Sequence, residues 1–200
     1  MRVQPVVEGH GEEGASQLLI RRVIEERIGS YESQILRPQR RASIESLLAR
    51  GGESLLRYQR VAERDSDLVL WLLDHDDGCL LESLRAAHGI LMREGVRVPT
   101  AFSFIPKEYE TMFLCEADCC ESYYKISREK FFAGRAARDA KGHISRTLPP
   151  GSIYKPTVDQ APLTARLNLD RLGEVFPPFL HLERVLRWGI ERPDRCIYPG

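Results

Sequence analysis

The sequence has no net charge, no long apolar run and no apolar signal core near its start. Its 29 basic and 29 acidic side chains cancel, so no overall field draws the chain to nucleic acid or to a membrane, and a nucleic-acid contact would need a local basic patch. No apolar run approaches the roughly 18 residues that a membrane span requires. A secretory signal needs an apolar core, whereas charge already arrives at Glu8. We therefore expect a cytoplasmic protein without membrane association.

The sequence lacks a recognisable cysteine ligand set and a disulfide framework, although it contains five cysteines. An odd number of thiols without a signal peptide argues against structural disulfides. Cys115, Cys119 and Cys120 lie close together in "CEADCC", but no C-x-x-C pair or nearby His completes a zinc site. Cys115 falls in an apolar run and is most simply a small core residue. We expect neither zinc nor a disulfide at these three residues or at Cys196.

The overall amino-acid composition is that of one globular domain. Hydrophobic residues make up 42% and charged residues 29% of the 200 positions, which is ordinary for a globular protein with a substantial core. The sequence contains no repeat and no clear linker. We expect a single domain over residues 1–200, with its core over about 1–115 and a helical C-terminal elaboration over about 116–200.

The order of the predicted strands and helices favours an α/β fold. Residues 68–73, "LVLWLL", are continuously apolar between two aspartates, which predicts a strand buried on both faces, as in a parallel sheet. The alternation of strands and helices predicts a mostly parallel central sheet of about four strands flanked by helices. Pro5 is an awkward residue for the first strand, because proline cannot donate to a ladder. Strands are expected at 3–7, 33–36, 68–73 and 98–106, and helices at 12–28, 42–63 with a break at Gly51-Gly52, 79–94 and 179–190.

Carboxylates gather where the predicted strands end. Glu8 follows the first strand, Asp74 and Asp76 follow "LVLWLL", and Glu108 and Glu110 follow the strand after that. Parallel strands bring such residues to one rim of the sheet, where ligands bind. Like charges a few Å apart raise a pKa or require a cation. Hard oxygen ligands suit Mg²⁺ or Mn²⁺, so the pattern predicts a divalent-metal site with Glu8, Asp74 and Asp76 as ligands.

The glycine-rich turn "EGHGEEG" after the first strand is shaped for an anion. Backbone N–H groups and the positive end of a helix dipole favour negative charge there. Gly9 and Gly11 leave room for a phosphate, which would arrive with its metal. His10 is a candidate phosphate contact or a solvated surface side chain. We interpret Glu12 and Glu13 as first-turn residues that the dipole favours, not as ligands.

The same acidic residues also fit a purely structural role. Asp74, Asp77 and Gly78 are residue types that cap helices and form turns at strand–helix junctions. A D-x-D pattern by itself is more often a turn than a site. His75 is expected to point away from the rim. The coincidence of D-x-D with Glu-Gly at the end of the first strand favours the metal site.

Basic residues gather in two places that could contact a nucleic-acid backbone. Arg37, Arg40 and Arg41 cluster in a predicted turn, and a second basic stretch covers residues 125–146. Both are candidate phosphate contacts. Both are equally typical of solvated faces, since acidic residues interleave with the second stretch.

The chain resembles TOPRIM domains, which occur in topoisomerases, bacterial primases, recombination-mediator proteins and OLD-type nucleases. The stretches "VVEGHGEE" and "LVLWLLDHDDGC" carry this resemblance. The chain resembles more closely the small TOPRIM-like proteins grouped as domain of unknown function 4276. That narrower resemblance lies in "IPKEYETMFL", "IYKPTVDQAPLTARLNL" and "FPPFLHLERVL", and the five stretches together cover nearly the whole length.

The resemblance implies a compact TOPRIM-type sheet flanked by helices, with a divalent-metal site. It places Glu8, Asp74 and Asp76 in that site, in agreement with the strand-end argument. It places Glu108 and Glu110 at the family's acidic motif, as further metal ligands. Two residues of the family's C-terminal motif correspond to Lys155 and Asp159.

The function that these features predict is phosphodiester hydrolysis assisted by Mg²⁺ or Mn²⁺, with nucleic acid as the substrate. The metal would activate water and neutralise charge on the phosphate. Asp74 and Asp76 are the expected ligands, and Glu8 is a ligand or a general base. Lys155 either stabilises the leaving oxygen or is a solvated surface residue.

Two other functions stay open. TOPRIM-like proteins of this sort resemble effectors of phage-defence or toxin-type systems, so a non-catalytic or partner-dependent module working with an ATPase is the main alternative. Nucleotidyl transfer, as in primases, would need a nucleotide pocket that the sequence does not locate. The sequence does not decide among DNA, RNA and nucleotide, and a homodimer is one candidate assembly.

Overall fold

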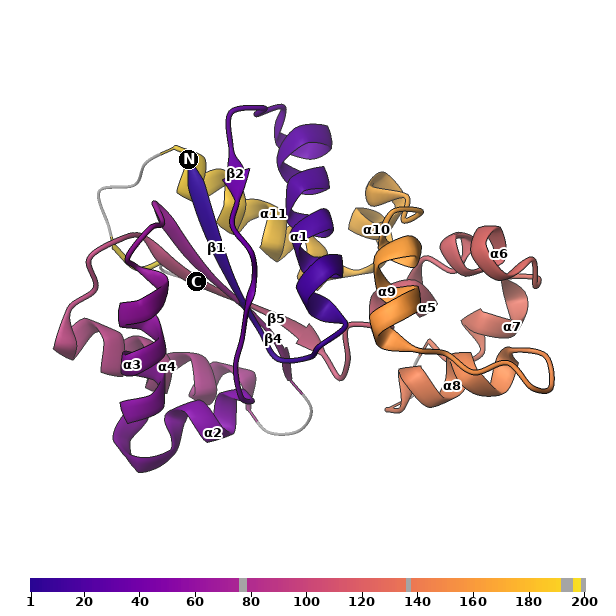
Figure 1. Ribbon diagram of the computed structural model, residues 1–200, viewed down its shortest axis with the longest axis horizontal. Helices are drawn as coiled ribbons and strands as arrows, with labels where there is room; N and C mark the ends of the chain where they lie inside the picture. The colour runs from indigo at the N-terminus through magenta and orange to yellow at the C-terminus, as the bar shows by residue number, and fades with distance from the viewer. Residues whose placement is uncertain (76–78, 136–137, 192–195, 199–200) are drawn as a thin grey trace.

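Five strands form a single parallel sheet in the computed structural model, which describes residues 1–75, 79–135, 138–191 and 196–198 (Figure 1). The strand order is β2-β1-β4-β5, and β3 also pairs with β1. Each of these pairs is parallel. The predicted α/β class, with a mostly parallel sheet flanked by helices, is confirmed. The strands are β1 (Arg2–Val7), β2 (Gln34–Ile35), β3 (Gln39–Arg40), β4 (Leu68–His75) and β5 (Thr100–Pro106).

Helices make up most of the remaining regular structure. Helix α1 continues into the π-helix η1, which ends at Gly29 with a left-handed backbone, φ 77°. The predicted break within 42–63 is confirmed, because Gly51 and Gly52 both have positive φ. The helices are α1 (Glu12–Arg22), η1 (Val23–Ile28), α2 (Ile44–Leu48), η2 (Ala49–Gly52), α3 (Glu53–Ala62), α4 (Leu80–Glu94), α5 (Thr111–Cys115), α6 (Asp118–Tyr124), α7 (Glu129–Phe132), α8 (Ala140–Thr147), α9 (Pro156–Thr164), α10 (Leu169–Val175) and α11 (Pro177–Ile190).

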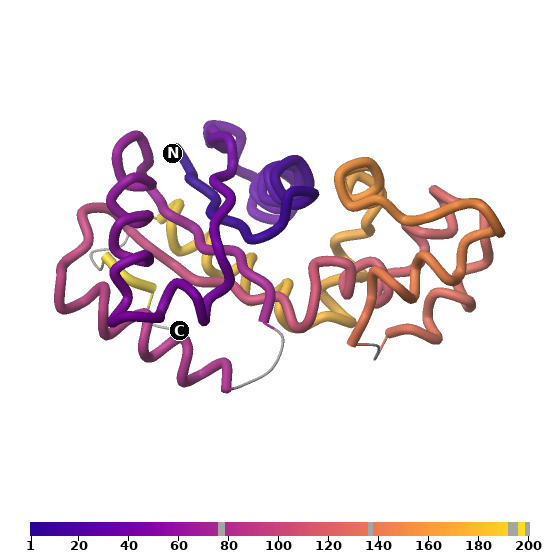
Figure 2. Tube along the Cα trace, turned by 60° about the horizontal axis from the view of Figure 1, so that its bottom comes forward, coloured from indigo at the N-terminus to yellow at the C-terminus, as the bar shows by residue number. Residues whose placement is uncertain are grey.

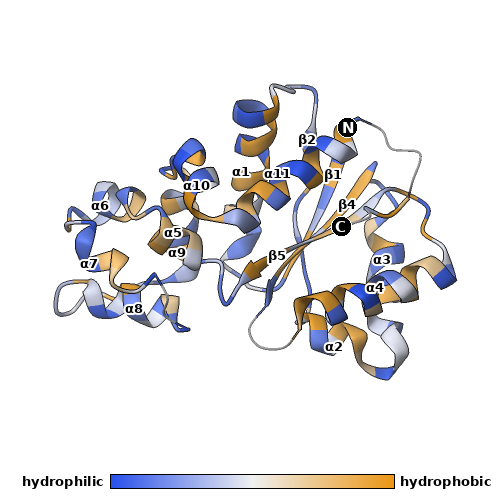
Figure 3. Cartoon of the chain, turned by 180° about the vertical axis from the view of Figure 1, so that it is seen from behind, coloured by the Kyte–Doolittle hydropathy of each residue, from blue (hydrophilic) through white to orange (hydrophobic). Residues whose placement is uncertain are grey.

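The two faces of the sheet carry two hydrophobic cores. On one face, Val3 and Leu70 pack with side chains of α1 and α11. On the other, Trp71 and Phe102 pack with α2, α3 and α4. Successive strand residues point to opposite faces, so the run 68–73 contributes to both cores. Its residues are all buried, as predicted, and Figure 3 shows the hydrophobic colouring of the strands between the helices.

Pro5 lies inside β1 at a position where no neighbouring strand needs a hydrogen bond from its backbone nitrogen. The carbonyls of Val3 and Val7 accept hydrogen bonds from the chain on the β2 and β3 side, so by alternation Pro5 faces that side as well. Opposite Pro5, β2 has ended and β3 has not yet begun. The carbonyl of Pro5 accepts a hydrogen bond from the Gln4 side-chain amide at 2.9 Å. The interruption between β2 and β3 accommodates the proline.

The chain after β5 forms a group of short helices beside the sheet and then returns to it. Figure 2 shows the chain from α5 to α10, coloured pink to orange, gathered at one end of the molecule, and α11, in yellow, leads back to pack against β5. The core on the α1 face continues into this group through Phe113, Phe131, Ile144 and Phe176. Helix α9 packs beside α1. The C-terminal elaboration is helical, as predicted.

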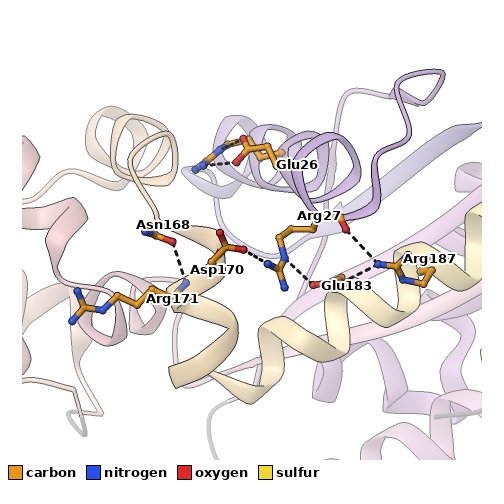
Figure 4. Close-up of polar contacts among 8 residues, drawn as sticks. Glu26, Arg27, Asn168, Asp170, Arg171, Glu183 and Arg187 are labelled. Atoms are coloured by element: carbon orange, nitrogen blue, oxygen red, sulfur yellow. Dashed lines mark hydrogen bonds and ion pairs between the residues drawn. The ribbon is translucent and has the colours of Figure 1, made fainter.

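An ionic network fixes α10 and α11 to the end of η1 (Figure 4). Arg27 of η1 forms an ion pair with Asp170 of α10, and its Nε lies 3.1 Å from Oε2 of Glu183 on α11. Arg187 extends the network, with Nη2 lying 3.1 Å from Glu183 Oε1. The same Nη2 donates to the Arg27 carbonyl at 3.4 Å. These contacts anchor the returning helix α11 to the helix that leaves β1.

The cysteines are free thiols, and the three of "CEADCC" are buried. Cys115 belongs to the core on the α1 face, which confirms its interpretation as a core residue. Cys119 and Cys120 lie in the same core, with their sulfur atoms 4.0 Å apart. No helix in the described residues has the length and apolar character needed to cross a membrane.

Candidate functional site

Acidic residues from three separate segments meet at the carboxyl edge of the sheet. Asp74 lies near the end of β4, next to β1, which leads through Glu8 to Glu12 at the start of α1. Glu110 follows β5 as the N-cap residue of α5. We call Glu12, Asp74 and Glu110 the acid cluster. Glu8 and Glu108 lie at its margin.

Two members of the acid cluster are buried and held by hydrogen bonds. Glu12 is 3% exposed, and its Oε2 accepts from the Glu8 backbone N–H at 3.2 Å. Glu110 is fully buried, and its Oε1 accepts from Tyr154 Oη and from Gln160 Nε2, each at 2.7 Å. Burial is the main cause that raises the pKa of both carboxyls above the ordinary value.

Asp74 is the most strongly perturbed acid of the cluster. Its Oδ1 is buried and has no hydrogen-bond partner in the described part of the chain. Burial raises the pKa of Asp74 to about 9, with Glu12, Glu110 and Glu8 adding to the rise and Lys141 opposing it. At neutral pH, and without a further cation, Asp74 therefore keeps its proton.

Lys141 of α8 supplies positive charge to these carboxylates. Its Nζ lies 3.7 Å from Glu110 Oε2 and 3.6 Å from Glu108 Oε1. Its backbone N–H donates to Glu108 Oε2 at 2.9 Å. Burial by itself would lower the pKa of Lys141, but Glu110, Glu108 and the other acids raise it above the ordinary value. The stretch 125–146 was expected to contact a nucleic-acid backbone or to be a solvated face, whereas the ammonium group of Lys141 faces the acid cluster.

Lys155 lies apart from the contacts that hold the acid cluster. Its side chain is exposed, and it is the N-cap residue of α9. The backbone N–H of Lys155 donates to Asp159 Oδ2 at 2.7 Å, and Tyr123 Oη donates to Asp159 Oδ1 at 3.0 Å. Asp159 therefore holds the start of α9. Asp76, Asp77 and Gly78 lie outside the described residues.

The three arginine side chains of the predicted basic cluster point in two directions. Arg37 is exposed and lies 3.5 Å from Glu13 Oε2. Arg40 Nη1 lies 2.7 Å from Nδ1 of the exposed His10. Both arginines therefore flank the glycine-rich turn. Arg41 instead packs inward, with its guanidinium 4.5 Å from the centre of the Tyr58 ring.

The two glycines of the turn allow close contacts that a side chain would block. A Cβ atom on Gly9 would lie 2.3 Å from Glu12 Oε1. A Cβ atom on Gly11 would lie 2.3 Å from Gln160 Oε1 and 2.7 Å from Pro156 atoms. A cavity of about 220 Å³ lies between this turn, Lys141 and the start of α9. A larger, apolar cavity of about 550 Å³ lies beside α4 and the other end of β5, away from the acid cluster.

His75 lies on the other face of β4 from Asp74, because neighbouring strand residues alternate. Its ring packs edge-on against Phe104, with centroids 5.8 Å apart. It therefore points away from the acid cluster, as expected.

Some residues of the site were not predicted from the sequence. Glu12 had a usable signal, since it is in helical phase with the buried Ala15 and Leu19. Tyr154 and Gln160 lie in the quoted stretch "IYKPTVDQAPLTARLNL", but nothing in it points to their contact with Glu110, and Lys141 had no signal.

The acid cluster offers oxygen ligands of the kind that Mg²⁺ and Mn²⁺ prefer. The unpartnered Asp74 Oδ1 fits such an ion. So does Glu110 Oε2, which faces Lys141 beyond hydrogen-bond distance. The part of the chain that the structure describes contains no group of three Asp, Glu, His or Cys residues already arranged to hold a metal. A complete ligand set therefore needs rearranged carboxylates or an additional residue.

Comparison of the chain with protein-family models, with curated proteins and with solved structures gives no match. The geometry of the acid cluster and of the adjoining turn is therefore the basis for assigning a function.

Proposed function

We propose that this protein is a divalent-metal-dependent phosphodiester hydrolase that acts on nucleic acid, with the acid cluster as its reaction centre. The observation that carries the proposal is the meeting of Glu12, Asp74 and Glu110 in a buried position, where burial, with a smaller contribution from the neighbouring acids, raises the pKa of Asp74 to about 9. Placing like charges together inside a protein is unfavourable unless they are neutralised. Perturbed acids at a ligand-binding edge of a sheet are characteristic of functional sites.

Each residue has a definite role in this proposal. The oxygens of Asp74, Glu12 and Glu110 would hold the ion, and Asp76 stays a predicted ligand. A bound ion supplies Lewis-acid polarisation and a water of lowered pKa. Glu8 orients or deprotonates the attacking water from the margin. Lys141 replaces Lys155 as the proposed cation beside the phosphate, because it is the lysine in contact with Glu110.

The resemblance to TOPRIM-like proteins supports the same function and suggests its setting. It favours an effector of a phage-defence or toxin-type system, with a partner ATPase to deliver the substrate. A homodimer is the assembly we propose to test first. Arg37 and Arg40 beside the glycine-rich turn provide the local basic patch that a neutral protein needs for nucleic acid.

One observation favours the partner-dependent, non-catalytic alternative. Lys141 already neutralises part of the acid cluster, and Glu110 is fully hydrogen-bonded at Oε1. A network of this kind can have a purely structural role, in which it holds α8 and α9 against the sheet. In that case the protein would bind its partner or nucleic acid through this edge without cleaving it.

The deciding experiment combines metal binding with cleavage. Mn²⁺ should raise the melting temperature of the parent by mass action and support cleavage of labelled RNA or DNA, with or without the partner ATPase. Asp74→Asn should abolish both effects. Glu26→Gln is the matched control, because Glu26 is exposed and pairs with Arg22 on the outer face of η1.

Each possible result decides between the two functions. An Asp74→Asn protein that cleaves as fast as the parent would exclude the acid cluster from catalysis. A parent that binds Mn²⁺ but never cleaves would favour the binding module.

A further inference from the structure

Four arginines adjoin one another between the glycine-rich turn and the start of α3. Arg40 ends β3, and its Nη1 lies 2.7 Å from Nδ1 of His10 in the turn. The guanidinium groups of Arg41 and Arg57 lie over the ring of Tyr58, 4.5 Å and 4.7 Å from its centre. Arg57 in turn lines a surface cavity with the fourth arginine. We call these residues the basic strip, which consists of Arg40, Arg41, Arg57 and Arg50.

The positive charge of the basic strip has no carboxylate partner in the part of the chain that the structure describes. None of its four arginines forms an ion pair there. Neutral groups hold the guanidiniums instead. Arg41 donates to Gln39 Oε1 at 2.7 Å, and Arg57 donates to Tyr58 Oη at 2.9 Å. Like charges are thus held side by side without a counter-charge, an arrangement that a bound anion stabilises.

The far end of the basic strip is open and polar. Arg50 and Arg57 are exposed, and they line a cavity of about 310 Å³ together with Glu53 and Ser54. Glu53 opposes an anion at this point. Two guanidinium groups face this single carboxylate, so the described wall of the cavity keeps a net positive charge.

The arginines of the strip differ in how far a ligand can reach them. Arg41 is half-buried, and its Nε is enclosed without a hydrogen-bond partner among the described residues. It therefore adds positive potential beneath the surface. Arg40, Arg50 and Arg57 are exposed, so they are the side chains that a ligand contacts directly.

We propose that the basic strip binds the phosphate backbone of nucleic acid, independently of base sequence, and leads it to the acid cluster. A row of separate cations matches a chain of phosphates rather than a single anion. Tyr58 already supports two guanidiniums, so the strip contacts the backbone, and backbone contacts carry no sequence information. The inference rests on the proposed function in taking nucleic acid as the polyanion, because the strip begins at the turn that adjoins the acid cluster. An acidic protein segment is the competing partner.

The direct test measures binding of a short labelled DNA, as a single strand and as a duplex, by fluorescence anisotropy in EDTA. The double variant Arg50→Gln/Arg57→Gln should bind about tenfold more weakly than the parent, because it loses two phosphate contacts. The slope of log affinity against log salt should fall by about 0.7 per arginine for the single strand and by about 0.9 for the duplex. Both residues are exposed, so the fold should tolerate the changes.

Arg184→Gln is the matched control for the double variant. Arg184 is exposed on α11, which covers the other face of the sheet, and it has no ion pair with a described carboxylate. Its replacement should leave affinity and salt slope unchanged. A double variant that binds like the parent, a loss of the same size in Arg184→Gln, or a parent that binds neither form of DNA would overturn the inference.

Two further ligands test the kind of partner. A second DNA of the same length and different sequence should bind with the same affinity, and a preference of more than about tenfold would contradict backbone recognition. A labelled poly-glutamate peptide should bind more weakly than DNA. Equal or tighter binding of this peptide would favour an acidic protein partner and overturn the inference.

These binding measurements fail independently of the proposed hydrolase. Binding that depends on Arg50 and Arg57, in a parent that never cleaves with Mn²⁺, would retain the inference and exclude the hydrolase. Cleavage with Mn²⁺, together with unchanged DNA binding in the double variant, would retain the hydrolase and overturn the inference.

Discussion

Asp74→Asn should change the pH dependence of stability in a way that the geometry around Asp74 fixes. The substitution keeps the shape of the side chain and replaces a carboxyl that is neutral in the folded state with a neutral amide. Burial raises the folded pKa of Asp74 to about 9 from its ordinary 3.8. The unfolded chain therefore releases this proton as pH rises through about 4, while the folded protein holds it until about 9.

The sign and size of the effect follow from this difference. The folded state binds more protons between about pH 4 and pH 9, so the stability contributed by Asp74 is complete below about pH 4 and is lost as pH rises towards 9. The upper limit is about 1.4 kcal/mol for each pH unit, and partial exposure of Asp74 reduces it. Relative to the parent, Asp74→Asn should gain stability progressively from about pH 4 to about pH 9.

Urea unfolding in EDTA at several pH values measures the difference directly. Asp67→Asn is the matched control, because hydrogen bonds from the Arg2 backbone and side chain lower the pKa of Asp67. That substitution should lower stability by an amount that stays constant from pH 5 to pH 9. Parallel pH curves for the parent and Asp74→Asn would refute the raised pKa and with it the burial of Asp74 beside the other acids.

Two further substitutions test the contacts around the site and the fold. Lys141→Met should lower the free energy of unfolding at pH 7 by about 2 kcal/mol, since it leaves the buried Glu110 carboxylate without its cation; an unchanged urea midpoint would show that the contact contributes nothing. Arg27→Met should cost less, about 1 kcal/mol, because the largely buried Glu183 loses one of its two charged partners and keeps Arg187. Glu26→Gln should cost less than about 0.5 kcal/mol in the same assay, as its ion pair is exposed.

The sheet was largely predictable because its strands are apolar on both faces. Residues 68–73 had to lie inside the protein because they are continuously apolar. The alternation of strands and helices then indicated that the neighbouring strands run parallel to this one. Strand β4 nevertheless runs on to His75, two residues beyond the apolar run, since its ladder with β5 continues to Pro106. Backbone pairing, rather than side-chain hydrophobicity, decides where that strand ends.

The acid cluster was predictable only where strand ends position it. Asp74 lies near the end of β4 and Glu110 follows β5, so the parallel sheet accounts for their meeting. Glu12 was interpreted only as a first-turn residue, although its helical phase with Leu19 turns it inward. Lys141 and Gln160 come from short C-terminal helices whose packing depends on long-range contacts, and no local pattern in the sequence predicts those contacts.

Mn²⁺ binding measured by electron paramagnetic resonance tests the central claim that the acid cluster is a divalent-metal centre. The parent and Glu26→Gln should bind Mn²⁺ stoichiometrically at neutral pH, and binding should weaken as pH falls and the carboxyls hold their protons. Asp74→Asn should lose this binding. Equal Mn²⁺ binding by Asp74→Asn and the parent, or no binding by any of the three proteins, would contradict the assignment.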